Sequence, residues 1–345
     1  MRISVEESAW TTWRSPSRSR RIGCVLGRIA FALGLVAFVS PIGRSQGVAG
    51  SPDAALGVYS RMGESLLSQE ILPRIMEALP AGERDLVRKV KVSVTSQTDP
   101  FRTGFVTRGG ARSVEISAAF LAALDITIDA TAFAIHSRNF RELPDYAADY
   151  GQFVREQWLE KSTPLVPIRL YPDYIGRPAD EARSFRATPE YRELRLAMMR
   201  QTLAWMSAHY AGHLVLERRD PPRPGGPDAH EREKRIDSFA SDLAHSAGFS
   251  PMPPLANTVL FSAIDHPQRD RSPHDWLCRA ADVMEHGIGQ LERDRRKASQ
   301  PAQSGSSSEK LVRERADLER IRKSYGCARV EAGPSRPMSD REKQG

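Results

Sequence analysis

Two histidines in the second half of the chain, His209 and His213, stand four positions apart within the run 208–214. A helix turns once in about 3.6 residues, so both imidazoles would lie on one face of a helix. Neutral imidazoles at this spacing can bind one divalent metal ion together. The spacing therefore predicts a candidate metal site on a helix.

Carboxylates that could complete such a site follow in the next apolar-periodic stretch, residues 228–247. Glu233 and Asp237 are again one helical turn apart there, at the edge of the apolar stripe. The stretch opens with the spacing of a capping box, an aspartate followed three positions later by a glutamate. We therefore expect a second helix that brings a carboxylate to the histidines.

Paired histidines followed by Glu-x-x-x-Asp on a later helix resemble the gluzincin zinc metallopeptidases, in particular the group that contains the HtpX-like and CAAX prenyl endopeptidases. The resemblance implies that His209, His213 and Glu233 bind zinc and that Asp237 orients a ligand histidine. Three protein ligands leave a fourth position open for water.

One position departs from the family pattern. The motif is His-Glu-x-x-His, and Tyr210 stands where the glutamate belongs. That glutamate is the general base that takes a proton from zinc-bound water, whereas a phenol loses its proton only near pH ~10. The departure indicates that the fold and the metal site persist while hydrolysis is weakened or lost. Tyr210 would then hydrogen-bond a metal-bound water or fill the place of the glutamate.

A histidine further along the chain completes the resemblance. The run Asp265-His266-Pro267 resembles a His-Pro element that follows the metal helices in the same peptidases. The resemblance implies that His266 stabilises charge on a bound carbonyl. The arginines that follow (Arg269, Arg271, Arg279) are irregularly spaced, so His266 alone is carried over.

Two other interpretations of the histidine pair stay open. His209, His213 and Glu217 could share a face, although three successive turns of one straight helix strain the geometry around a single ion. The histidines could also be purely structural and bind nothing.

The elements that must position these residues follow from periodicity. Apolar residues at helical spacing predict a helix over 54–79, and a content rich in Leu, Ala and Met indicates a long helix over 188–217. Helices are also expected over 118–136 and about 276–291, and alternation predicts strands at 90–94 and 113–117. The predicted class is α+β, a mostly helical metallopeptidase-like domain with a small antiparallel sheet packed on the metal-binding helices. By the resemblance, residues 104–110 would be the edge strand that aligns an extended polypeptide.

Composition divides the chain into a leader, a body and a tail. Residues 51–292 would form the metallopeptidase-like domain, with 137–186 as a candidate insertion over the cleft. Residues 293–345 are polar and predicted to be largely disordered apart from a short amphipathic helix near 309–325. Cys278 and Cys327 could pair in an exported chain or remain unrelated thiols.

The leader, residues 1–50, has an arginine-rich start, an apolar core at 29–39 and small residues after it, as a signal peptide does. The core is shorter than the ~20 residues that span a bilayer, although an uncleaved membrane anchor is the competing interpretation. The leader also carries +5 of the chain's net charge of +7, so the basicity does not indicate a nucleic-acid partner.

These observations favour an exported, periplasmic or cell-envelope protein that resembles a zinc metalloendopeptidase, degenerate or weakly active for want of the general base. The alternative is a non-catalytic envelope binding or adaptor protein that keeps the peptidase cleft and holds an extended polypeptide.

Overall fold

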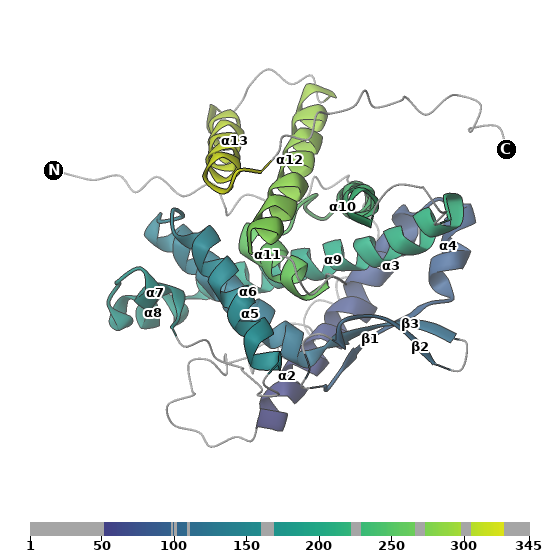
Figure 1. Cartoon of the computed structure of the whole chain (residues 1–345), viewed down its shortest axis with the longest axis horizontal. Coiled ribbons are helices and arrows are strands. Elements are labelled where there is room, and N and C mark those ends of the chain that lie inside the picture. The colour runs from purple at the N-terminus through teal and green to yellow at the C-terminus, as the bar shows by residue number, and fades with distance from the viewer. Residues whose placement is uncertain are drawn as a thin grey trace, which may run out of the picture.

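The computed structural model describes residues 52–97, 99, 102–108, 111–159, 169–221, 229–265, 273–297 and 305–327 (Figure 1). Most of these residues are helical and three strands form one small sheet, so the α+β class is confirmed. In chain order the elements are α2 (Pro52–Leu66), the π-helical turn η3 (Leu67–Ile71), α3 (Leu72–Ala78), α4 (Ala81–Arg88), β1 (Lys91–Thr95), β2 (Gly104–Arg108), β3 (Ala111–Ser117), α5 (Ala118–Ser137), α6 (Leu143–Leu159), α7 (Tyr171–Tyr174), α8 (Ala179–Arg186), α9 (Pro189–Arg219), α10 (Ala229–Ser246), α11 (Leu255–Asp265), α12 (Pro273–Lys297) and α13 (Gly305–Tyr325).

The sheet is mixed, and the expectation of an antiparallel sheet is wrong in this respect. β3 lies in the middle, with β2 antiparallel on one side and β1 parallel on the other. Alternation located the strands, and the paired residues Val94 and Ile116 both lie in the core, although β3 is buried on both faces from Val114 to Ser117. Alternation does not report the direction of a neighbouring strand, which depends on how distant segments dock.

α5 is the buried helix at the centre of the core, in contact with α2, α9 and α11. Among the described residues it is the helix long and apolar enough to cross a membrane, and 94% of its most apolar window is buried inside the structure. Burial of this kind is what a core helix shows. The leader, whose role as a signal peptide or anchor was predicted, lies outside the described residues.

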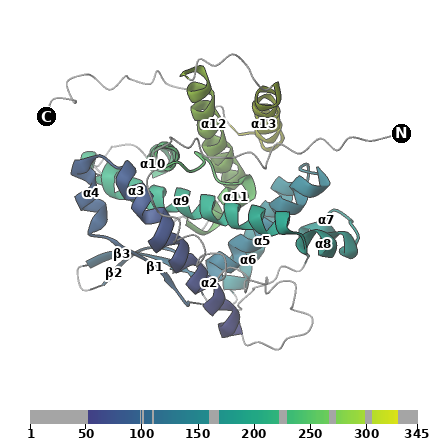
Figure 2. The ribbon, with the colours of Figure 1, turned by 180° about the vertical axis from the view of Figure 1, so that it is seen from behind.

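α9 carries the histidine pair and crosses the middle of the molecule, with α12 on one side and the sheet on the other (Figures 1 and 2). Its start is fixed by Thr188, whose hydroxyl accepts a hydrogen bond from the Tyr191 backbone N–H at 3.1 Å, and by proline at the first helical position. α10 packs closely on α9 at Gly212, where an added Cβ would lie 3.0 Å from Phe239 Cδ1 and 3.2 Å from Ile236 Cγ2. Glycine at this crossing lets the two helices approach.

Segments before and after α9 and α10 in the sequence, among them α6 and α13, pack on the rest of the protein. α6 contributes Tyr146 and Tyr150 to the main core, whereas the role of 137–186 as an insertion over the cleft stays a prediction. The predicted helix of the tail is present as α13. Cys278 of α12 and Cys327 are joined by a disulfide, so the structure selects the paired alternative and fastens α13 to α12.

Candidate metal centre

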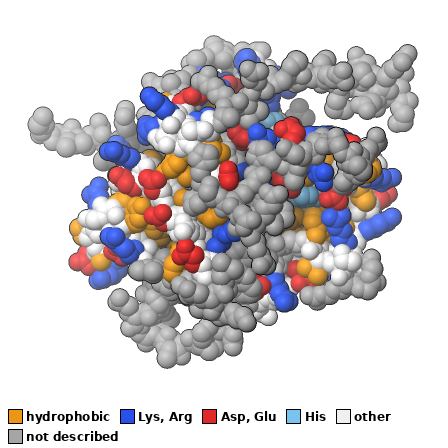
Figure 3. Space-filling view, viewed as in Figure 1, with side chains coloured by type: hydrophobic (Ala, Val, Ile, Leu, Met, Phe, Trp, Pro, Cys, Tyr) orange, Lys and Arg blue, Asp and Glu red, His pale blue; other side chains and the backbone are white. Residues whose placement is uncertain are grey.

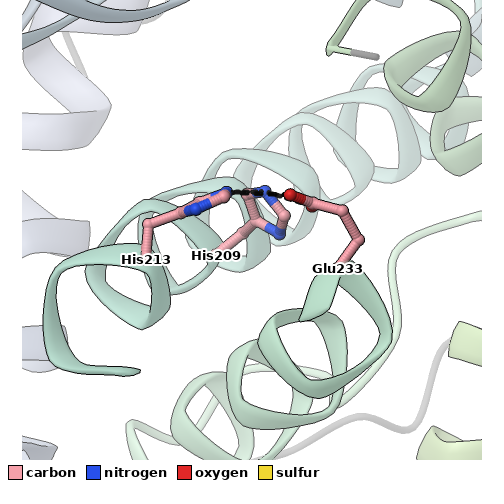
Figure 4. A group of neighbouring side chains, drawn as sticks. All are labelled: His209, His213 and Glu233. Atoms are coloured by element: carbon pink, nitrogen blue, oxygen red, sulfur yellow. Dashed lines mark hydrogen bonds and ion pairs between the residues drawn. The ribbon is translucent and has the colours of Figure 1, made fainter. Parts of the chain in front are cut away.

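Two imidazoles and one carboxylate converge between α9 and α10. The Nε2 atoms of His209 and His213 are 3.1 Å apart. Glu233 reaches across from α10, with one carboxylate oxygen 3.7 Å from the Nε2 of His209 and the other 3.7 Å from the Nε2 of His213. Figure 4 shows the three side chains pointing toward one another from the two helices. The structure thus brings together the three residues that the resemblance assigned as ligands.

The separations fit a small divalent ion. In a tetrahedral zinc site, ligand atoms about 2.0–2.1 Å from the ion lie about 3.3 Å from one another. One ligand atom from each of the three residues can be chosen so that all lie within 4.8 Å of one another. Two imidazoles and a carboxylate are also a donor set that zinc accepts, and they leave a fourth position open. The residues present therefore fit a zinc ion.

Asp237 lies behind His209, one turn after Glu233 on α10. Its Oδ1 is 2.9 Å from the Nδ1 of His209. Burial alone would raise the pKa of Asp237, but the charge of Arg279 and the bond to His209 hold the pKa of this carboxyl well below its usual value. An ionised Asp237 accepts the Nδ1–H, which leaves the Nε2 lone pair directed at the cluster, as a metal ligand requires.

Arg279 of α12 contacts both carboxylates, although its irregular spacing after His266 gave no ground to assign it to the site. Its Nε donates to Asp237 Oδ2 at 2.8 Å, and one terminal nitrogen donates to Asp237 Oδ1 at 2.9 Å and to Glu233 Oε2 at 3.3 Å. The signal that could have found it is periodicity, because Arg279 follows buried Trp276 by three positions and precedes buried Val283 by four. An arginine on the apolar face of a helix needs a buried carboxylate partner.

Tyr210 packs beside the cluster with 2% of its surface exposed. Its ring meets those of Phe105, His209 and Phe261 edge-on, with centroid separations of 5.5, 5.6 and 6.4 Å. Position 210 therefore supplies a phenol to the surroundings of the cluster and not the carboxylate of the family motif. Whether Tyr210 fills the place of the glutamate or hydrogen-bonds a metal-bound water stays a prediction.

Glu217 lies at the opposite side of the His213 ring from the cluster. Its Oε1 is 3.6 Å from His213 Nδ1, and its Oε2 accepts a hydrogen bond from Arg112 at 3.1 Å. The contact with His213, helped by Arg112 against the effect of partial burial, lowers the pKa of Glu217 to about 2. Glu217 therefore faces the wrong ring nitrogen to complete the competing ligand set, and Glu233 takes that place.

The surroundings of the cluster are apolar on one side and open on the other. His209 is fully buried, stacked on Trp205 with ring centroids 5.5 Å apart and meeting Phe261 edge-on at 5.2 Å. The side chains of His213 and Glu233 are 16% and 17% exposed. Low polarity around His209 strengthens a metal–ligand bond, and the exposed part of His213 and Glu233 gives an ion a route from solvent.

The edge strand β2 borders the same cluster. Phe105 of β2 meets the ring of His213 edge-on, with centroids 5.8 Å apart. Of the described strands, β2 pairs on one side only, with β3. His266, the remaining candidate from the sequence, lies outside the described residues, as do Arg269 and Arg271.

No family model, curated protein or solved structure matches the chain. The assignment of the site therefore depends on its geometry and burial alone.

Proposed function

We propose that the chain binds one zinc ion through His209, His213 and Glu233 and is an exported, degenerate relative of the gluzincin metallopeptidases. The observation that carries the proposal is the convergence of the two Nε2 atoms and the Glu233 carboxylate, with separations of 3.1 and 3.7 Å. If both imidazoles carry their proton on Nδ1, all three groups direct a lone pair toward one point, and a cation stabilises that arrangement.

Each residue of the site has a defined part in this proposal. The two imidazoles bind as neutral ligands, and Glu233 adds one negative charge. Asp237 and Arg279 fix the orientation of His209 from behind. A zinc ion held there would polarise a peptide carbonyl and a bound water. Without a carboxylate at position 210 the proton of that water has no strong acceptor, and general bases contribute about 10²–10⁴-fold to such reactions.

An extended polypeptide is the ligand that the surroundings favour. β2 lies at the edge of the sheet beside His213, and a strand edge binds an extended chain through backbone hydrogen bonds. On the face shown in Figure 3, acidic and basic side chains are intermixed over the described part. A mixed surface favours a polypeptide over a nucleic acid, which requires a basic one.

Tyr210 favours a second candidate function in which the same site binds without cutting. In that case the protein is an envelope binding or adaptor protein, and a zinc ion held by His209, His213 and Glu233 would bind the carbonyl oxygen of a polypeptide. The two candidates share the metal site and differ in hydrolysis.

The experiment measures zinc per chain and peptide hydrolysis for the purified full chain. We expect about one zinc, lost in His213→Ala and retained in the control His286→Ala, whose imidazole pairs with Asp242 elsewhere on α10. Hydrolysis should be weak in the wild type and should rise in Tyr210→Glu. Unchanged hydrolysis in zinc-loaded Tyr210→Glu favours the binding protein, whereas a chain without zinc, with melting indifferent to chelator, contradicts both candidates.

A further inference from the structure

Both histidines of the cluster have the same kind of neighbour behind them. His209 turns its Nδ1 to Asp237, which is held by Arg279. His213 turns its Nδ1 to Glu217, which is held by Arg112. A carboxylate paired with an arginine therefore stands behind each imidazole, on the side away from the other two ligand groups.

We propose that Glu217 is a second positioning residue, which orients His213 toward the metal, and that Arg112 of β3 holds Glu217 in place. The inference rests on the proposed zinc site. The resemblance implies an orienting carboxylate for one histidine only, and it gives Glu217 no role.

The local geometry supports this role. Glu217 follows His213 by one turn of α9, so its side chain lies on the same face of the helix. Its Oε1 lies 3.6 Å from Nδ1, slightly longer than a hydrogen bond. Carboxylates behind metal-bound histidines accept a hydrogen bond from the second ring nitrogen and so fix the ring orientation and the tautomer, and a small rotation of the Glu217 side chain would bring its oxygen to that distance.

Arg112 connects this pair to the sheet. Its guanidinium carbon lies 3.8 Å from the centroid of the Phe105 ring, and Phe105 in turn meets His213 edge-on. Arg112, Glu217, His213 and Phe105 thus form a closed circle of contacts between β2, β3 and α9. The sheet thereby positions one metal ligand.

The two pairs differ in exposure, and the difference sets the expected size of the effect. The side chains of Arg279 and Asp237 are 8% and 6% exposed, whereas those of Arg112 and Glu217 are 38% and 33% exposed. Solvent and salt screen the outer pair more strongly. Loss of Glu217 should therefore weaken zinc binding less than loss of Asp237, and the deficit should shrink at high salt.

The test is zinc affinity of the full chain, measured by competition with a chromophoric chelator. Glu217→Ala should bind zinc about tenfold more weakly, the lower end of the range for residues behind a metal ligand. Glu217→Gln, which keeps an oxygen at the same distance, should recover most of that loss. The matched control is Glu193→Ala, an exposed glutamate on the same helix, and it should bind as the wild type does.

A second measurement separates positioning from a merely structural role. The visible absorption of the cobalt(II)-loaded chain reports the geometry around the metal, and it should change in Glu217→Ala but not in Glu193→Ala. Melting of the chelator-treated chain should be nearly the same in both. If Glu217→Ala does not fold, Arg112→Met should still weaken zinc binding about threefold, the size of a partly exposed ion pair.

The outcomes distinguish this inference from the proposed function. A wild-type chain that binds no zinc overturns both. A wild-type chain that binds zinc, with Glu217→Ala and Arg112→Met at wild-type affinity and an unchanged cobalt spectrum, overturns the role of Glu217 and leaves the zinc site standing.

Discussion

α9 supports two buried clusters of charged groups, one near each end, and they are built differently. Near its N-terminal end, Arg195 donates to both oxygens of Asp125, and Tyr191 donates to Asp129 at 2.8 Å. Each of these carboxylates also receives a second partner: Tyr59 donates to Asp125 at 2.8 Å, and Arg186 donates to both oxygens of Asp129 at 2.8 and 2.6 Å. In this network donors face acceptors throughout.

The cluster near the C-terminal end brings together groups that can all accept a hydrogen bond. The Nε2 atoms of His209 and His213 and the Glu233 carboxylate face one another, and Arg279 donates to Glu233 and to Asp237 from behind. Burial of charge is common to both clusters and therefore does not mark a site. In the first cluster each carboxylate has its own donors, whereas in the second the two Nε2 atoms face each other and which of them donates depends on the tautomer. We propose that a cation completes the second cluster and that the first is structural.

The largest expected effect is on stability, and it tests the cluster near the N-terminal end of α9. Asp125→Ala leaves Arg195 buried without its carboxylate, and breaking such a pair should lower the free energy of unfolding by about 3–5 kcal/mol. Urea unfolding measures it, with the exposed Asp180→Ala as a control near zero. Zinc per folded chain should not change, and zinc loss without loss of stability would break the comparison.

Arg279→Met should affect both stability and the metal site. It removes the partner of buried Asp237 and a contact of Glu233, so we expect a loss of about 3 kcal/mol and a zinc affinity lowered about 10–100-fold. Arg183→Met, on the surface of α8, is the control. Wild-type zinc affinity in Arg279→Met would show that Asp237 orients His209 without its arginine.

Gly212→Ala should act on the metal site through helix packing. The new Cβ would lie 3.0 Å from Phe239 and push α10, with Glu233, away from α9. We expect a loss of about 1–2 kcal/mol in stability from overpacking, and weaker zinc binding. Gly82→Ala, in a helix where an added Cβ meets nothing within 4 Å, should be neutral or stabilising by about 0.5 kcal/mol. Equal behaviour of the two variants would contradict the close crossing.

The smallest and most gradual effect is a pH dependence. Because the pKa of Asp237 is depressed in the folded chain, by Arg279 and His209 against the opposing effect of burial, its contribution to stability is complete above the ordinary aspartate pKa of about 4 and is lost as pH falls below it. The advantage of the chelator-treated wild type over Asp237→Asn should shrink from pH 5 downward, at about 1.4 kcal/mol per unit at most. A stability advantage of the wild type that grows as the pH falls would contradict the assignment of Asp237 as ionised in the folded chain.

Local features of the chain were predictable from its sequence. Long apolar runs located α5 and α9, which are buried on most sides, and an apolar stripe located α10, while Thr188 and Pro189 mark the start of α9. The spacing of His209 with His213, and of Glu233 with Asp237, fixes a common face within each helix. The meeting of the two faces followed from the resemblance, and the structure brings these residues together.

Features that depend on distant segments were not predictable. Three such features involve contacts between segments far apart in sequence: the direction of β1 relative to β3, the pairing of Asp237 with Arg279, and the close approach of α10 to α9 at Gly212. The carboxylates of α5 were missed for the same reason, because each finds its arginine more than fifty positions away. A charged residue inside an apolar helix indicates that a partner of opposite charge exists, but the sequence does not show which residue that partner is.

Anomalous scattering at the zinc absorption edge, from crystals of the full chain grown with zinc, tests the central claim most directly. We predict one peak between α9 and α10, about 2.0–2.2 Å from both Nε2 atoms and from an oxygen of Glu233. Density without such a peak, with Glu233 turned away from His209 and His213, would contradict the metal site and with it the kinship to the peptidases that we propose.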